Sequence, residues 1–137
     1  MSTRMSPRPC SPRSGCCSPL GTRSTGCGWW KHTGSDERSM LADNTSAFNC
    51  RGVPGSTAWS QHAYGRAVDL NPFENPEVRG SQIDPPAASA WAGRSRAGPA
   101  VIHHGDAAWR AFTAVGWTWG GDWSYPLDYM HFSANGQ

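Results

Sequence analysis

Long apolar runs are missing from this chain of 137 residues. A signal peptide needs an apolar stretch of about seven residues or more behind its positive charges, and the N-terminal region has arginines without such a stretch. A membrane-spanning helix needs about twenty apolar residues, and the sequence has no run of that kind. The sequence therefore predicts neither a signal peptide nor a transmembrane segment.

Cysteine spacing typical of zinc fingers is also missing. The tandem Cys16–Cys17 lacks CxxC spacing, and no pair of histidines follows at finger spacing, so we do not expect a structural zinc site in this region. The other cysteines are Cys10, Cys27 and Cys50. An odd number of cysteines without a secretion signal argues against a disulfide framework, which stays the less favoured alternative.

Charge is divided unevenly along the chain. Residues 1–33 hold five basic groups and no acidic ones, whereas residues 34–137 hold seven basic and ten acidic groups, a net charge near −3. The clustered basic residues of a nucleic-acid-binding surface are therefore not expected on the folded part. The first segment is rich in Ser, Pro, Arg, Gly and Cys without helical or strand periodicity, which is typical of a disordered tail.

An out-of-frame translation is the second interpretation of residues 1–33. With GC-rich codons, a shift of one nucleotide can turn residues 15–33 into a segment with an apolar-periodic start and a strand-like end. On this interpretation the chain lacks a core helix, a core strand and its true N-terminus, and the missing signal peptide is an artefact.

Composition favours one small domain over residues 34–137. Hydrophobic residues make up 37% of the chain, with 16 Gly and 11 Pro, which indicates a loop-rich α+β fold with a short antiparallel sheet and helices packed to one side. Four of the eight tryptophans lie close together: Trp109, Trp117, Trp119 and Trp123. Each can bury a large area, so we expect core packing, with a substrate cleft as the alternative.

Periodicity predicts only a few elements. AVDL, at 67–70, reads as a short buried strand, and Gly65 is suited to the turn before it. Asp106 is a suitable N-cap for a helix that ends at Gly116, because apolar residues follow it at helical spacing. Residues 43–46 indicate a turn.

Loops and strands are expected around these elements. Residues 71–78 are proline-punctuated, and residues 80–100 read as a long Gly/Ala/Ser/Pro loop. WTWGGDW, at 117–123, reads as a strand with a tight turn, and residues 128–132 read as the final strand. In a regular final strand the side chains of Asp128 and His131 would point to opposite faces. If both serve one site, a bend or bulge is therefore expected at 129–130.

Four polar residues carry most of the functional information. His62 and Asp69 are seven positions apart, and Asp128 and His131 are three apart. Two imidazoles and a carboxylate are a familiar ligand set for catalytic zinc, with a fourth position left for water. A further carboxylate can move the proton of that water. Taken singly, the same residues could be a surface histidine, a capping aspartate or a core histidine.

Three other polar residues are expected to lie in surface loops or turns rather than in a metal site. His103 and His104 are adjacent, so their side chains should diverge, and we read them as surface loop residues rather than a second metal site. Asp122 reads as a turn residue.

The motifs SxHxxGxAxDL at 60–70, GWxWGGxW at 116–123 and DYMHF at 128–132 occur in an order that resembles the VanY-like D-alanyl-D-alanine carboxypeptidases and L-alanyl-D-glutamate endopeptidases. Residues 34–51 are also similar to this family, so the resemblance runs from about Gly34 to Phe132. These proteins are zinc peptidases that cut peptides of bacterial peptidoglycan. The resemblance implies the same activity here, and it does not separate carboxypeptidase from endopeptidase cleavage.

The resemblance also assigns roles. It implies one Zn²⁺ ion held by His62, Asp69 and His131, with Asp128 as the catalytic carboxylate and Arg51 facing the substrate. Many relatives have an acidic residue where this chain has Ser133, and Ser60 and Tyr64 flank the first ligand as possible supporting residues. The expected partners are peptidoglycan peptides, which lie outside the cytoplasm, and the expected state is a monomer. A non-catalytic zinc-stabilised wall-binding module and a truncated inactive remnant are the alternatives.

Overall fold

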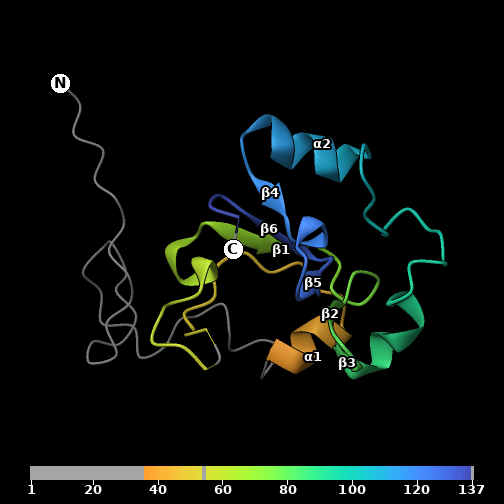
Figure 1. Ribbon diagram of the computed structural model, residues 1–137, viewed down its shortest axis with the longest axis horizontal. Coiled ribbons are helices and arrows are strands. Elements are labelled where there is room, and N and C mark those ends of the chain that lie inside the picture. Colours follow the sequence, from red (N-terminus) through yellow and green to blue (C-terminus); the bar gives the residue numbers. More distant parts are fainter. Residues whose placement is uncertain (1–35, 54, 137) are drawn as a thin grey trace.

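The computed structural model of the protein describes residues 36–53 and 55–136 (Figure 1). The expectations for residues 1–33, and those for Cys10, Cys16–Cys17 and Cys27, lie outside the described residues. Among the described residues, no helix combines the length and apolar character that crossing a bilayer requires.

In the described part of the chain, six short strands form two antiparallel sheets. One sheet has the order β1-β6-β4 and the other β3-β2-β5. The strands are β1 Ala67–Asp69, β2 Glu77–Arg79, β3 Gln82–Asp84, β4 Thr118–Trp119, β5 Leu127–Asp128 and β6 His131–Ser133. The expected α+β class with short antiparallel pairing is confirmed, and the strands divide into two sheets rather than one.

Helices are few and short. The α-helices are α1 Asp36–Leu41 and α2 Ala107–Ala114, and the 3-10 helices are η2 Gln61–Tyr64, η3 Pro86–Trp91 and η4 Gly120–Asp122. Helix α2 lies beside β4, whereas α1 lies near β2 and β3 at the other end of the ribbon (Figure 1).

Helix α2 begins and ends where the sequence predicts. Asp106 is its N-cap, with Oδ1 accepting a hydrogen bond from the backbone N–H of Trp109 at 2.8 Å. Gly116 follows the helix with φ +82°, a conformation that glycine adopts without steric cost. The predicted strand at 67–70 is also confirmed, as β1.

The expected structureless loops at 71–78 and 80–100 are wrong in part. They contain β2, β3 and η3, and Gly80 and Ser81 form the two-residue turn between β2 and β3, with Gly80 at φ +63°. A Gly-Ser pair between short runs is a hairpin signal that the sequence does carry. Helix α1, within a segment read only as polar with a turn, was not predicted either.

The predicted final strand at 128–132 is wrong as one element. Asp128 ends β5 in one sheet, and His131 begins β6 in the other, with a turn at Tyr129 and Met130 between them. The break lies where a bend was expected, but it moves the chain between sheets instead of bulging one strand. Likewise β4 covers only Thr118–Trp119, and a 3-10 turn, η4, takes the place of the tight turn.

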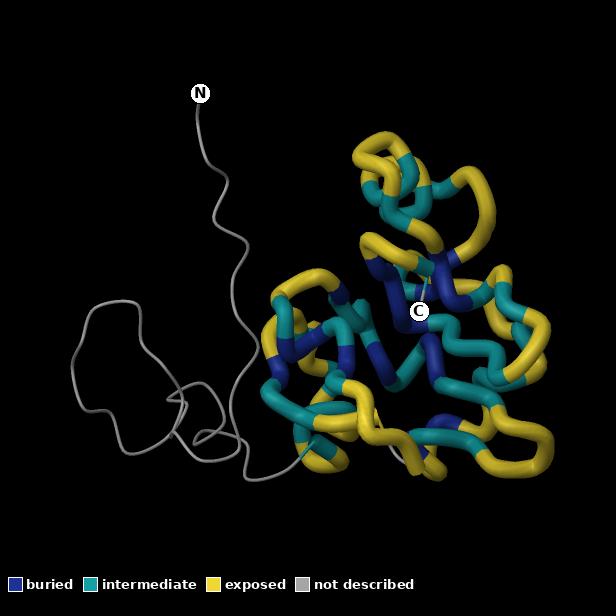
Figure 2. Tube along the Cα trace, turned by 60° about the vertical axis from the view of Figure 1, so that its left-hand side comes forward, coloured by how far each residue is buried: buried dark blue, intermediate teal, exposed yellow. Residues whose placement is uncertain are grey.

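The apolar core lies between the β1-β6-β4 sheet and α2. Ile102, Trp119 and Phe132 are buried at its centre, and the Phe112 ring stacks on that of Phe132 with centroids 4.5 Å apart. The buried stretches lie inside the fold, and the exposed stretches are mostly outer loops (Figure 2). The expected core role of the tryptophans is confirmed for Trp119, with Trp109 and Trp117 packed against this core.

Candidate metal centre

Three side chains converge between the turn η2 and the paired strands β1 and β6. His62 comes from η2, Asp69 from the end of β1 and His131 from the start of β6, and one ligand atom of each lies within 4.8 Å of the others. Asp69 and His131 are direct register partners in the antiparallel pair. Opposite side chains on an antiparallel pair lie on the same face, so the strand register brings these two together.

The contacts within this cluster are short. His131 Nδ1 lies 2.9 Å from Asp69 Oδ1, His62 Nε2 lies 3.2 Å from Asp69 Oδ2, and the two imidazole nitrogens are 3.3 Å apart. Both histidines are buried. Two imidazole nitrogens and both carboxylate oxygens therefore face one small space.

Backbone contacts fix the orientation of His62. Its Nδ1 donates a hydrogen bond to the carbonyl oxygen of Ala47 at 2.9 Å, since a carbonyl can only accept, and Nε2 is therefore the ring nitrogen that faces the cluster. Ser60 Oγ accepts a hydrogen bond from the backbone N–H of His62, and Gly65, at φ +64°, closes the turn. Histidine ligands of metals usually donate their second nitrogen in this way.

The electrostatics of the cluster suit a cation. Burial opposes the charged form of Asp69, but the hydrogen bonds from His131 and His62 prevail and hold the pKa of this carboxyl well below its usual range. Burial likewise opposes the charged form of His131, yet Asp69 raises the pKa of its imidazole. A negative carboxylate between two inward-facing imidazoles is a donor set that fits a divalent ion such as zinc.

Asp128 lies beside this cluster without being part of it. Burial, followed by the negative charge of Asp69, raises the pKa of Asp128 to about 8. Among the described residues, its buried Oδ1 has no hydrogen-bond partner. A bound dication nearby would stabilise the ionised form and pull this pKa down.

The fold brings the backbone of η4 unusually close to Asp128. A Cβ added at Gly120 would lie 2.5 Å from the carbonyl oxygen of Asp128 and 3.0 Å from its Cβ. A Cβ added at Gly121 would meet the indole of Trp119 at 2.5 Å. A side chain at either position would force its neighbour to shift, so Gly120 allows the close approach to Asp128 and Gly121 leaves room for the Trp119 indole.

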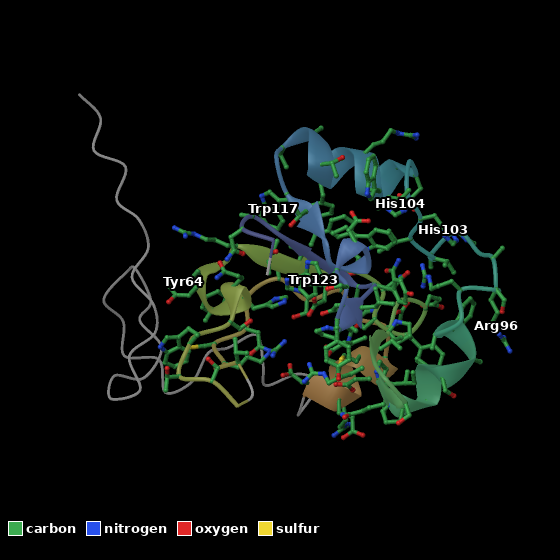
Figure 3. All side chains as sticks on the ribbon, viewed as in Figure 1. Tyr64, Arg96, His103, His104, Trp117 and Trp123 are labelled. Carbon is green, nitrogen blue, oxygen red and sulfur yellow. The ribbon has the colours of Figure 1, made fainter. Side chains whose placement is uncertain are left out.

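A cavity of about 830 Å³ opens onto the cluster. It is lined by His62, Asp69, Asp128 and His131, and also by Arg51 and Trp123. The Trp123 ring lies 5.3 Å from that of His131, and Figure 3 places it near the centre of the molecule. Trp123 therefore lines this cavity, whereas Trp119 belongs to the core.

Arg51 lies on the wall of the cavity. Its Nε is 3.8 Å from Asp36 Oδ2, and both side chains are partly exposed, at 41% and 44%. This distance is too long for a hydrogen bond, and among the described residues the buried Nε has no hydrogen-bond partner.

The remaining polar candidates lie away from the cluster. His103 and His104 are exposed, at the edge of the molecule (Figure 3), and His104 Nε2 is 2.5 Å from Asp122 Oδ1 in η4. Tyr64 lies at the opposite edge, with the Arg66 guanidinium 5.9 Å from its ring centroid. Ser133, where many relatives carry an acid, is fully buried in β6.

The sequence profile of the D-alanyl-D-alanine carboxypeptidase family matches residues 54–134, more than half of the chain. The chain belongs to this family. The resemblance stated from the motifs is thereby confirmed, and the protein is a peptidase of the D-alanyl-D-alanine carboxypeptidase type. No curated protein and no solved structure matches the chain.

The matched span of this peptidase includes the whole cluster and Asp128, whereas Arg51 lies before it. Sequence reasoning missed Gly120 and the role of the Ala47 carbonyl. The glycine pair at 120–121 was a visible signal, since adjacent glycines often mark close backbone approach. The Ala47 carbonyl could not be found, because any residue supplies a backbone carbonyl.

Proposed function

We propose that this protein is a zinc-dependent peptidase that hydrolyses peptide bonds in peptidoglycan stem peptides. The observation that supports this most directly is the convergence of His62, Asp69 and His131 on one space at the base of a cavity, with a buried carboxylate alongside. The substrate lies outside the cytoplasm, so we place the activity in the cell wall, with a monomer as the acting species.

His62, Asp69 and His131 would hold one zinc ion. Such an ion, when bound, polarises the scissile carbonyl and makes water a better nucleophile near neutral pH. The protein's own part would be to present two neutral imidazoles and one carboxylate, and the contact of His62 Nδ1 with the Ala47 carbonyl supports binding of the ion through Nε2.

Asp128 would carry the proton. Burial raises the pKa of this carboxyl and a bound dication would lower it again, so the group could both accept and donate a proton near neutral pH, as a general acid–base must. It takes the proton from the attacking water and delivers it to the amine that leaves. Its position in the same cavity as the ligands supports this role.

Arg51 would bind a carboxylate of the substrate. Its guanidinium offers a planar fork of donors, which suits a carboxylate better than a point charge does. This contact is compatible with carboxypeptidase cleavage, which releases a terminal residue, and with endopeptidase cleavage, which cuts within the stem peptide.

A non-catalytic wall-binding module that uses zinc for stability is the rival function. Such a module has no use for a buried, unpaired carboxylate beside the metal, because a buried polar group without a partner costs stability. Asp128 therefore favours the enzyme.

Metal analysis and product analysis together test the proposal. The purified protein should bind about one zinc per chain and convert peptidoglycan fragments to products that mass spectrometry can identify. Released alanine indicates carboxypeptidase cleavage, and a new internal N-terminus indicates endopeptidase cleavage. Asp122→Asn is a matched control for Asp128→Asn, since Asp122 is exposed and pairs with His104 instead. A chain that binds zinc and never cleaves would support the binding module.

A further inference from the structure

The guanidinium of Arg94 forms a clamp between separate segments of the chain. It follows η3 with a left-handed backbone, φ +55°, which is uncommon for a residue with a side chain. Its guanidinium donates to the backbone carbonyl of Glu74 at 2.9 Å, to Asn75 Oδ1 at 3.1 Å and to the backbone carbonyl of Ile102. The clamp therefore ties two separate segments, one at residues 74–75 and one at Ile102, to the loop that carries Arg94.

Asn75 connects this clamp to the strand that carries Asp69. Its side chain is fully buried and donates to the carbonyls of Asn71, at 3.0 Å, and Leu70, at 3.4 Å. Leu70 directly follows Asp69, the last residue of β1. The guanidinium of Arg94 is thus fixed relative to one of the proposed metal ligands.

The face of the same guanidinium covers Tyr129. The carbon at the centre of the guanidinium lies 4.4 Å from the ring centroid, well inside the range of about 6 Å for a cation–π contact. Tyr129 is the residue after Asp128, in the turn where the chain passes from one sheet to the other. Its carbonyl also accepts a hydrogen bond from Trp119 Nε1 at 2.8 Å. The ring of Tyr129 is therefore held by Arg94, and its backbone carbonyl is held by Trp119.

We propose that Arg94 is a positioning residue, which acts through Tyr129 to fix the carboxylate of Asp128 relative to Asp69. This inference rests on the proposed function. Neither Arg94 nor Tyr129 is among the described residues that line the cavity, so neither is placed to contact a substrate bound there. Asp128 ends a strand of only two residues. The turn that follows therefore adds to the support that η4 gives from the other side of the strand end.

The expected effect falls on turnover and not on binding. Displacing a catalytic group by about 1 Å can cost about a hundredfold in rate. Arg94→Met keeps an unbranched side chain of similar reach but removes the cation and its donors. It should lower kcat by roughly tenfold to a hundredfold, with KM and zinc content unchanged.

Arg96→Met is the matched control. Arg96 is two positions further on, and its guanidinium lies 5.4 Å from the Trp91 ring on an exposed loop. Removing it deletes a similar contact far from Asp128, so kcat should stay at the wild-type level. This control separates the specific role of Arg94 from a general loss of arginine–aromatic contacts.

A double-variant cycle tests whether Arg94 acts through Tyr129. Tyr129→Leu should lower kcat as Arg94→Met does. Tyr129→Phe keeps the ring face, so it should keep most of the wild-type kcat. The double variant Arg94→Met/Tyr129→Leu should be no slower than the slower of the two single variants. Independent effects, in which the two losses multiply, would overturn the inference. So would an unchanged kcat in Arg94→Met, or a fall in kcat matched by an equal loss of zinc.

Two further outcomes are distinguishable. If Arg94→Met does not fold, the comparison of Tyr129→Leu with Tyr129→Phe carries the same test, and equal kcat in these two refutes the role of the ring. If the wild-type protein itself binds zinc but does not hydrolyse peptides, the proposed function fails, and the positioning role fails with it.

Discussion

Gly120→Ala tests whether the close approach of η4 controls the position of Asp128. The added methyl group would lie 2.5 Å from the Asp128 carbonyl oxygen and 3.0 Å from its Cβ. An ordinary carbon–oxygen contact is about 3.3–3.6 Å. The backbone of η4 or of Asp128 must therefore move by roughly 1 Å, because neither atom belongs to the flexible end of a side chain.

The cost of this shift should appear mainly in catalysis. Overpacking of this kind destabilises a protein by about 1–3 kcal/mol, which lowers the melting temperature without abolishing the fold. A displacement of about 1 Å at a catalytic group costs about a hundredfold in rate. His62 and Asp69 belong to η2 and β1, whereas the contact joins η4 to β5, so these two ligands should keep their places and zinc content should stay close to one per chain.

The assay is turnover of a peptidoglycan-derived peptide, followed by chromatography, with zinc measured on the same sample. Gly98→Ala serves as the control, since its added Cβ would meet only Val101 Cγ2 at 3.8 Å, an ordinary contact. A folded, zinc-loaded Gly120→Ala protein with wild-type kcat would refute the idea that this contact positions Asp128.

Three further predictions concern the cluster itself. His131→Ala removes one of three ligands and should lower zinc content sharply, measured by elemental analysis; full occupancy would exclude His131 as a ligand. Asp128→Asn should keep its zinc and lose about a hundredfold or more in kcat, and undiminished turnover would remove Asp128 from the mechanism. In the zinc-free protein, Asp128 keeps its proton up to a pKa of about 8, whereas the unfolded chain releases it near pH 4. The native state therefore binds more protons between these values, and the free energy of unfolding should fall as pH rises from 5 to 8 by up to about 1.4 kcal/mol per pH unit. Thermal melts that show the same slope in Asp128→Asn would contradict this.

Local signals in the sequence sufficed for the elements that depend on near neighbours. Helix α2 has its own N-cap, apolar periodicity and terminal glycine within eleven residues, 106–116, so its bounds could be predicted. The pairing of Asp128 with His131 at a spacing of three, and of His62 with Asp69 across a turn glycine, likewise identified the candidate site. The remaining strands have two or three residues each, too few to show an alternating pattern.

The residue types at the proposed site, their order along the chain and the family resemblance are properties of the sequence by itself. The tertiary structure decided how these residues meet. The register of β1 against β6 places Asp69 opposite His131, and the switch between sheets at Tyr129 turns Asp128 toward the same cavity. The reason is physical: a pairing between residues 62 positions apart depends on which sheet each strand joins, and local periodicity carries no record of that choice.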